Sequence, residues 1–215
     1  MQYLDVTLSQ DHEAIVVAFD ICSSTEVIES LIRRAELGRY TKLLEKIKHH
    51  LADAQRTLPF VLYKFTGDGW ILLFPLSDNQ GQRVDVRQVL TFMHDLSVWF
   101  KRAFQEFVGK HLDTPLSTTG IKFGVDKGPL HRMTMYQRKE YIGRAIIVAC
   151  RLQAAIKDRD KSPAYKALVT NSVFNNHFAP VTEYKVTAVK RILQNIAGGA
   201  PFQCKKIDLL KSARS

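Results

Sequence analysis

The stretch FVLYKFTGDGWILLFP, residues 60–75, decides how the chain folds. Two apolar runs of strand length, 60–65 and 70–74, are rich in aliphatic and aromatic side chains. Thr66-Gly67-Asp68-Gly69 separates them, and Asp-Gly between two such runs predicts a β-hairpin. The pattern therefore places Asp68 at the tip of two adjacent strands.

Upstream of this hairpin, residues 14–19 (AIVVAF) form a continuous apolar run that predicts a strand buried on both faces. The run ends at Asp20, and Ser23-Ser24-Thr25-Glu26 follows with hydroxyls that can cap a helix and with an early acid. Apolar residues then recur at helical spacing as far as Leu51. We expect Gly38 to divide this region into two helices.

Downstream, the same patterns predict a long amphipathic helix over 84–107, a strand over 120–125, a helix over 143–156, and edge strands over 181–189 and 202–207. The resulting order, β-α-β-β-α-β-α, is typical of an α+β fold. We expect helices on one side of a mainly antiparallel sheet. A single stand-alone domain spanning residues 1–215 is the predicted organisation.

Composition narrows the function classes. The chain has 215 residues, 46% of them hydrophobic and 24% charged, which excludes a disordered or collagen-like protein. Its net charge of +10 favours polyanionic partners, but the basic residues are scattered and no zinc-finger, RNP or P-loop pattern accompanies them. Nucleic-acid binding is therefore not predicted, and it remains an alternative that rests on charge alone.

The predicted compartment is the cytoplasm. The N-terminal residues Met1–Asp5 lack the basic and apolar regions of a secretory signal. No apolar run approaches the ~18 residues that a membrane span needs, so we expect no membrane association. The three cysteines show no CxxC spacing and cannot form a closed set of disulfides, which suits a reducing environment.

Two acidic residues are predicted to meet at neighbouring strand ends. Asp20 follows the first strand and Asp68 lies in the hairpin turn, so their carboxylates offer oxygen ligands to a hard divalent cation. Taken singly, Asp20 could cap the next helix and Asp68 could be a turn residue. That helix begins at Ser23-Ser24-Thr25, and the free N–H groups of a helix start bind anions. Cations beside a phosphate-binding helix start imply nucleoside triphosphate chemistry.

Four motifs in the same order resemble the class III nucleotidyl cyclase catalytic domain. They are Phe19-Asp20-Ile21 with Ser24-Thr25, Lys64-Phe65-Thr66-Gly67-Asp68-Gly69, Gly124-Val125-Asp126-Lys127-Gly128, and Glu140-Tyr141-Ile142-Gly143 with Ala149-Cys150-Arg151-Leu152. The resemblance spans residues 14–192. It implies a ferredoxin-like fold and a homodimer with two shared active sites.

The resemblance also implies roles for individual residues. Asp20, Asp68 and the carbonyl of Ile21 would bind two divalent cations, Mn²⁺ or Mg²⁺, that serve in-line attack on the α-phosphorus. Arg151 would be the catalytic arginine that steadies the transferring phosphoryl group, reaching the site of the other chain. Lys190 matches a triphosphate-binding lysine of the family.

The resemblance implies that Lys64 and Glu140 recognise the base of the nucleotide. Guanylate cyclases carry Glu at the Lys64 position and adenylate cyclases usually carry Asp at the Glu140 position, so the chain departs from both. A further departure is Ile147, where the family commonly has an Asn that orients the ribose by hydrogen bonding, which isoleucine cannot do.

The stand-alone organisation, the stretch YKFTGDGWILLFP at residues 63–75 and the absence of that Asn together resemble the pyrimidine cyclases of the bacterial Pycsar antiphage systems. The resemblance implies that the chain makes cyclic UMP or cyclic CMP, which activates a partner effector. We favour UTP because an ionised Glu140 would accept the N3–H of uracil while Lys64 binds an oxygen. Two alternatives stay open: an adenylate cyclase, and a catalytically dead cyclase-like module that binds a nucleotide.

Overall fold

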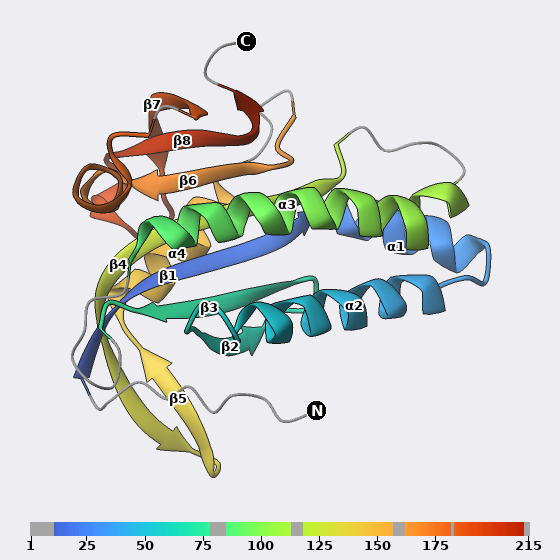
Figure 1. The fold of residues 1–215 in the computed structure, drawn as a ribbon, viewed down its shortest axis with the longest axis horizontal. Coiled ribbons are helices and arrows are strands. Elements are labelled where there is room, and N and C mark those ends of the chain that lie inside the picture. The colour runs from blue at the N-terminus through green and yellow to red at the C-terminus, as the bar shows by residue number, and fades with distance from the viewer. Residues whose placement is uncertain (1–10, 78–84, 113–117, 157–161, 182, 213–215) are drawn as a thin grey trace.

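The computed structural model describes residues 11–77, 85–112, 118–156, 162–181 and 183–212. Within them, strands form one mixed sheet (Figure 1). The strands are β1 Asp11–Cys22, β2 Val61–Phe65, β3 Gly69–Pro75, β4 Gly120–Met135, β5 Arg138–Ile142, β6 Lys166–Thr170, β7 Tyr184–Ile192 and β8 Pro201–Ser212. The predicted hairpin is present as β2 and β3.

The predicted helices are present as well. The longer ones are α1 Ser24–Arg33, α2 Gly38–Ala54, α3 Arg87–Phe107 and α4 Arg144–Ala154, and the short turns are η1 Gly109–His111, α5 Asn171–Val173, η2 Phe174–Phe178 and η3 Ala197–Gly199. Gly38 is the first residue of α2, so the expected division into two helices is confirmed. Val84, predicted to begin the third helix, lies outside the described residues, as do Thr182 and Met1–Asp5. No helix in the described ranges is long and apolar enough to cross a membrane.

Helices cover both faces of the sheet, so the expectation of helices on one side was wrong. On β1, Ile15, Val17 and Phe19 pack into the core beneath α2 and α3. The alternate residues, with Val16 as an example, pack on the opposite face with Ala149 of α4. Figure 1 shows α2 and α3 in front of the sheet and α4 behind it. A strand buried on both faces is continuously apolar, which explains the pattern of 14–19.

The strand order is β2-β3-β1-β4-β6-β8-β7, with β5 paired to β4. The first four strands pair antiparallel in the ferredoxin-like order, and this confirms the predicted α+β class. The pairing of β4 with β6 is parallel, with α4 in the connection. Only one of the two predicted tail strands lies at an edge, because β8 pairs with both β6 and β7. The error arose because β6, the inner partner of β8, was not predicted.

A long hairpin arm extends from the sheet. The strand predicted over 120–125 continues as β4 to Met135 and returns as β5. The turn between them has positive φ at Tyr136 (48°) and Gln137 (63°), as a two-residue hairpin turn requires. Tyr136 is 93% exposed. Figure 1 shows the arm leaving the body of the molecule below β1 and β3.

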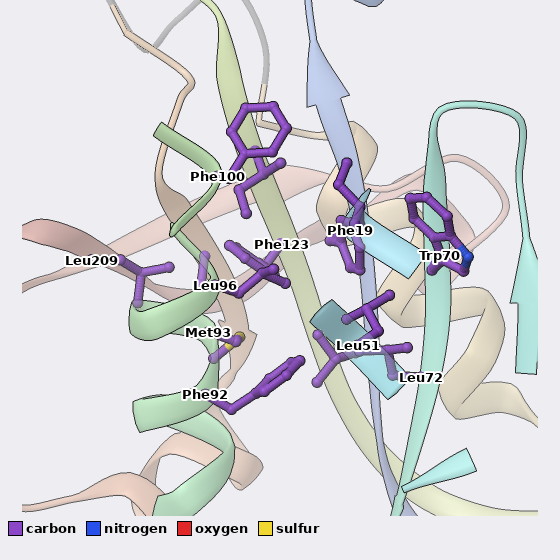
Figure 2. Close-up of a cluster of buried hydrophobic side chains, with 14 of the residues drawn as sticks. Phe19, Leu51, Trp70, Leu72, Phe92, Met93, Leu96, Phe100, Phe123 and Leu209 are labelled. Carbon is purple, nitrogen blue, oxygen red and sulfur yellow. The ribbon is translucent and has the colours of Figure 1, made fainter. Parts of the chain in front are cut away.

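Aromatic packing fixes the end of β1 from which Asp20 projects. Phe19 stacks on Trp70 with 5.5 Å between ring centroids and lies 5.8 Å from the ring of Phe123. Figure 2 shows side chains of α3 facing these rings across the core. Gly69 pairs with Asp20, and a Cβ at Gly69 would overlap the carbonyl oxygen of Phe19. The close approach of β3 to β1 thus requires glycine beside the candidate site.

Candidate active site

The β1–β3 pairing brings the two predicted metal-binding aspartates together. Asp20 pairs with Gly69, so Asp68 lies next to the end of β1. The backbone N–H of Ile21 donates to the carbonyl oxygen of Asp68 at 3.2 Å. The side chain of Ile21 is buried, which leaves its backbone as the group it can offer. Two carboxylates and a backbone carbonyl therefore gather at one end of the sheet.

The electrostatics of Asp20 show a carboxylate whose negative charge is only partly balanced by its surroundings. Burial, and after it the neighbouring carboxylate of Asp68, raise the pKa of Asp20 to about 7. The ammonium of Lys122, 3.7 Å from Asp20 Oδ2, opposes this rise only in part. A divalent cation between the carboxylates would favour the ionised form of both.

The oxygen atoms of Asp20 have different surroundings. Oδ2 accepts a hydrogen bond from Gln153 Nε2 at 3.0 Å, whereas Oδ1 is buried and has no hydrogen-bond partner among the described residues. An orphaned carboxylate oxygen next to a second carboxylate fits a hard cation with oxygen ligands. Within the described ranges, no group of three or more His, Cys, Asp or Glu side chains is arranged to hold a metal ion.

The start of α1 lies against the same carboxylates. Ser23 precedes the helix in the left-handed region, at φ 58°, and its hydroxyl shares a 2.9 Å hydrogen bond with Thr118 instead of capping the helix. The Ser24 hydroxyl donates to Asp68 Oδ2. Thr25 is exposed in the first turn. The first N–H groups of α1 therefore lie beside Asp68 without a side-chain cap on them.

Lys64 and Glu140, the predicted base-reading pair, come together from β2 and β5. Lys64 Nζ lies 3.5 Å from Glu140 Oε2. The Tyr63 hydroxyl, 2.7 Å from the same oxygen, is a third member that sequence analysis missed. The hydrogen bond from Tyr63 and the charge of Lys64 lower the pKa of Glu140. Burial and the bond to Glu140 raise the pKa of Tyr63 to about 12, so Tyr63 is the donor.

Arg151 and Lys190 lie apart from the aspartates of their own chain. Arg151, near the end of α4, donates from Nη1 to Gln194 Oε1 at 3.4 Å. Lys190 is exposed on β7. Ile147 lies one turn before Arg151 on the same helical face and is 54% exposed. This face of α4 therefore presents an arginine and an uncovered apolar side chain.

The sequence matches no family model and no curated protein. The structure, in contrast, is similar to solved structures of nucleotide cyclases. The adenylyl cyclase CyaB from P. aeruginosa superposes with a TM-score of 0.66 at 16% identity, covering 94% of this chain and 96% of that chain. The guanylyl cyclase Cya2 gives 0.68 at 14% identity, covering 92% of each chain. The chain has the class III nucleotide cyclase fold.

A third cyclase structure extends the comparison. The catalytic core of a rhodopsin-guanylyl cyclase with converted specificity, in complex with ATPαS, gives a TM-score of 0.63 at 15% identity, covering 94% of this chain and 98% of that chain. At these identities the likeness defines the cyclase fold. The chemistry has to be argued from Asp20, Asp68 and the groups around them.

Proposed function

We propose that the chain is a nucleotide cyclase that converts a nucleoside triphosphate to its 3′,5′-cyclic monophosphate and pyrophosphate. The observation that carries the proposal is the pair Asp20 and Asp68, half-buried at adjacent strand ends with one buried and orphaned oxygen on Asp20, in the fold of the class III cyclases. Two divalent cations held by this pair and the Ile21 carbonyl, Mn²⁺ or Mg²⁺, would supply Lewis-acid chemistry at the ribose 3′-hydroxyl and the phosphates.

The proposed reaction is an internal phosphoryl transfer. The ribose 3′-oxygen forms a bond to the α-phosphorus, the bond from that phosphorus to its bridging oxygen breaks, pyrophosphate leaves, and the hydroxyl proton passes to solvent. The N–H groups of Ser23, Ser24 and Thr25 at the start of α1 would bind phosphate oxygens. Arg151 would stabilise the charge on the transferring group, and Lys190 would bind the triphosphate.

The proposed active site is shared between two copies of the chain. Arg151 and Gln153 lie two residues apart on α4, about 200° around the helix axis. Gln153 faces Asp20 of its own chain, so Arg151 faces away from that site. A head-to-tail homodimer would bring the arginine of each copy to the aspartates of the other.

For the base we propose a pyrimidine, with UTP favoured over CTP. Lys64 donates and Glu140 accepts, and the lowered pKa of Glu140 keeps it ionised for the N3–H of uracil. Glutamate is one methylene longer than aspartate, which leaves room for one ring. A methylene discriminates by only ~1–3 kcal/mol, so we expect a preference that is not absolute. The product would activate an effector in bacterial antiphage defence, in the cytoplasm, where the three free cysteines stay reduced.

The experiment is incubation of the purified protein with Mn²⁺ and each of ATP, GTP, CTP and UTP, with identification of the products by mass. We expect cyclic UMP as the main product and its loss in Asp68→Ala. The matched control is Asp53→Ala, an exposed aspartate of α2 that pairs with Arg56, and it should retain full activity.

Each other outcome favours a different function. Undiminished activity in Asp68→Ala would contradict the two-metal proposal. Faster turnover of ATP than of both pyrimidine triphosphates would establish the adenylate cyclase alternative. Binding of nucleotide without any cyclic product would establish the dead module, for which Ile147 is the motivating residue.

A further inference from the structure

Gln153 makes a contact that the proposed chemistry does not use. It lies in the last turn of α4, and its Nε2 donates to Asp20 Oδ2 at 3.0 Å. The same oxygen has Lys122 Nζ at 3.7 Å. Both interactions of Asp20 with cationic or donor side chains thus end on Oδ2. Oδ1, the orphaned oxygen, has no protein donor among the described residues.

A glycine in β4 allows Gln153 to reach Asp20. Gly124 of β4 lies under α4, and a Cβ there would overlap the Ala149 carbonyl oxygen and the backbone nitrogen of Gln153. Glycine at this position lets the backbone of α4 approach the backbone of β4 directly. Asp20 pairs with Lys122 on the adjacent strand, so the side chain of Gln153 crosses β4 to the carboxylate of β1.

We propose that Gln153 is a positioning residue of the metal centre. By donating to Oδ2 it fixes the rotation of the Asp20 carboxylate, so that Oδ1 stays directed to the cation and Oδ2 cannot replace it. Hydrogen-bonded partners of metal-binding carboxylates orient the ligand in this way. An amide suits the role because, unlike the ammonium of Lys122, it adds no positive charge that competes with the cation. The inference rests on the proposed function of Asp20.

The test is a Mn²⁺ titration of the purified protein, followed by electron paramagnetic resonance of the free ion, without nucleotide. Gln153→Met keeps the length and helix preference of the side chain and removes the donor. We expect about tenfold weaker Mn²⁺ binding, the lower end of the loss when such a partner is removed. Gln88→Met, an exposed glutamine in α3, is the matched control and should bind as the wild type does.

A purely structural role would alter stability rather than affinity, so thermal unfolding in metal-free buffer is measured alongside. We expect a modestly lower midpoint for Gln153→Met, because the hydrogen bond to Asp20 is lost, with the protein still fully folded at the temperature of the Mn²⁺ titration. Gln153→Ala serves as a second variant if the methionine disturbs α4, with the same tenfold loss expected. Affinity within twofold of wild type in both variants would overturn the inference.

Asp20→Asn distinguishes this failure from failure of the proposed function. If Asp20→Asn abolishes Mn²⁺ binding while both Gln153 variants bind normally, only the positioning role is wrong. If Asp20→Asn binds Mn²⁺ like the wild type, the metal centre itself is wrong and the role of Gln153 is overturned with it.

Discussion

Two carboxylates in the candidate site, those of Asp20 and Glu140, each accept hydrogen bonds from protein side chains through one oxygen. Asp20 is bound by Gln153 through Oδ2, and Glu140 is bound by Tyr63 and Lys64 through Oε2. A carboxylate oxygen that accepts a protein hydrogen bond is fixed in direction, and its companion is then fixed as well. At each position the protein binds one carboxylate oxygen itself, and under the proposed function the other oxygen would face the ligand.

Removal of the Tyr63 hydroxyl should relax base selection. In Tyr63→Phe, Glu140 loses the 2.7 Å hydrogen bond that orients it, while the ring that packs at 5.4 Å from Tyr141 is retained. A hydrogen bond to a charged group contributes ~1.5–3 kcal/mol, so we expect the ratio of kcat/KM for UTP to that for ATP to fall about tenfold.

The measurement is steady-state kinetics with each triphosphate. Tyr184→Phe, at the start of β7, is the control and should leave the ratio unchanged. An unchanged ratio in Tyr63→Phe would show that Tyr63 does not orient the base-reading acid.

Sequence analysis found the site residues that lie in continuous motifs and missed those whose roles arise from packing. Asp20 and Asp68 follow strand-like runs, so their meeting could be predicted from the hairpin. Lys122 and Gln153 carry no local sequence signal. Lys122 lies beside Asp20 because of the register of β1 with β4, and Gln153 reaches Asp20 because α4 packs directly on Gly124. Such contacts depend on tertiary structure that periodicity does not encode.

At the scale of elements, α4 packs directly on the backbone of β4 near the site. A methyl group at Gly124 would overlap backbone atoms of α4, which cannot move aside as a flexible side chain can. We expect Gly124→Ala to lower the free energy of unfolding by about 3 kcal/mol, the upper end of typical overpacking effects. Denaturant unfolding monitored by circular dichroism is the measurement.

Gly38→Ala is the matched control for this prediction. No atom lies within 4 Å of a Cβ at Gly38, and the residue opens α2. It should gain about 0.4–1 kcal/mol, because alanine restricts the unfolded chain more than glycine does. Equal stability of the two alanine variants would show that α4 can shift without cost.

The elements themselves were predictable where their periodicity was clear. The helices and the β2–β3 hairpin followed from apolar spacing and Asp-Gly. The outer half of β4 and all of β5 did not, because they form an exposed arm with mixed polar residues. Strand β6 was missed although it is buried like an inner strand. It is only five residues long, and the residues on either side of it show no clear apolar periodicity. Short apolar runs are ambiguous without their neighbours.

At the scale of the whole molecule, four of the exposed large apolar side chains lie on the arm and on the outer face of α4. Tyr136, Met135 and Ile142 belong to the arm, and Ile147 belongs to α4 beside Arg151. Figure 1 shows the arm standing free of the helices. Exposed apolar side chains of this size are candidates for a protein–protein interface. A second copy of the chain is the occupant that the shared-site proposal requires.

Mixing two inactive variants should restore activity if the sites are shared. Asp20→Ala removes a metal ligand and Arg151→Ala removes the arginine, so each homodimer is inactive. In a mixed dimer one site has all its wild-type groups and the other has neither. With random subunit exchange, half of the dimers are mixed, so we expect about a quarter of wild-type activity, on the symmetry of a two-fold dimer.

The measurement is cyclic-nucleotide production after slow exchange of the two purified variants at equal concentration. A doubly substituted chain, Asp20→Ala with Arg151→Ala, mixed with either single variant is the control and should give no activity. No recovery after verified exchange would show that each chain uses its own arginine, or none.

The position of Gln153 two residues after Arg151 has a consequence for how the two sites of a dimer communicate. One helix would hold the metal ligand of its own site on one side and supply the arginine of the neighbouring site on the other. A cation that reorients Asp20 would shift α4 through Gln153. The shift would also move Arg151, which lies about 200° away around the same helix. Thermodynamic linkage makes this effect reciprocal. If cation binding at one site changes the affinity for substrate at the other site, substrate binding there changes the affinity for the cation by the same factor. Metal saturation of the dimer should then be cooperative, with α4 as the physical connection.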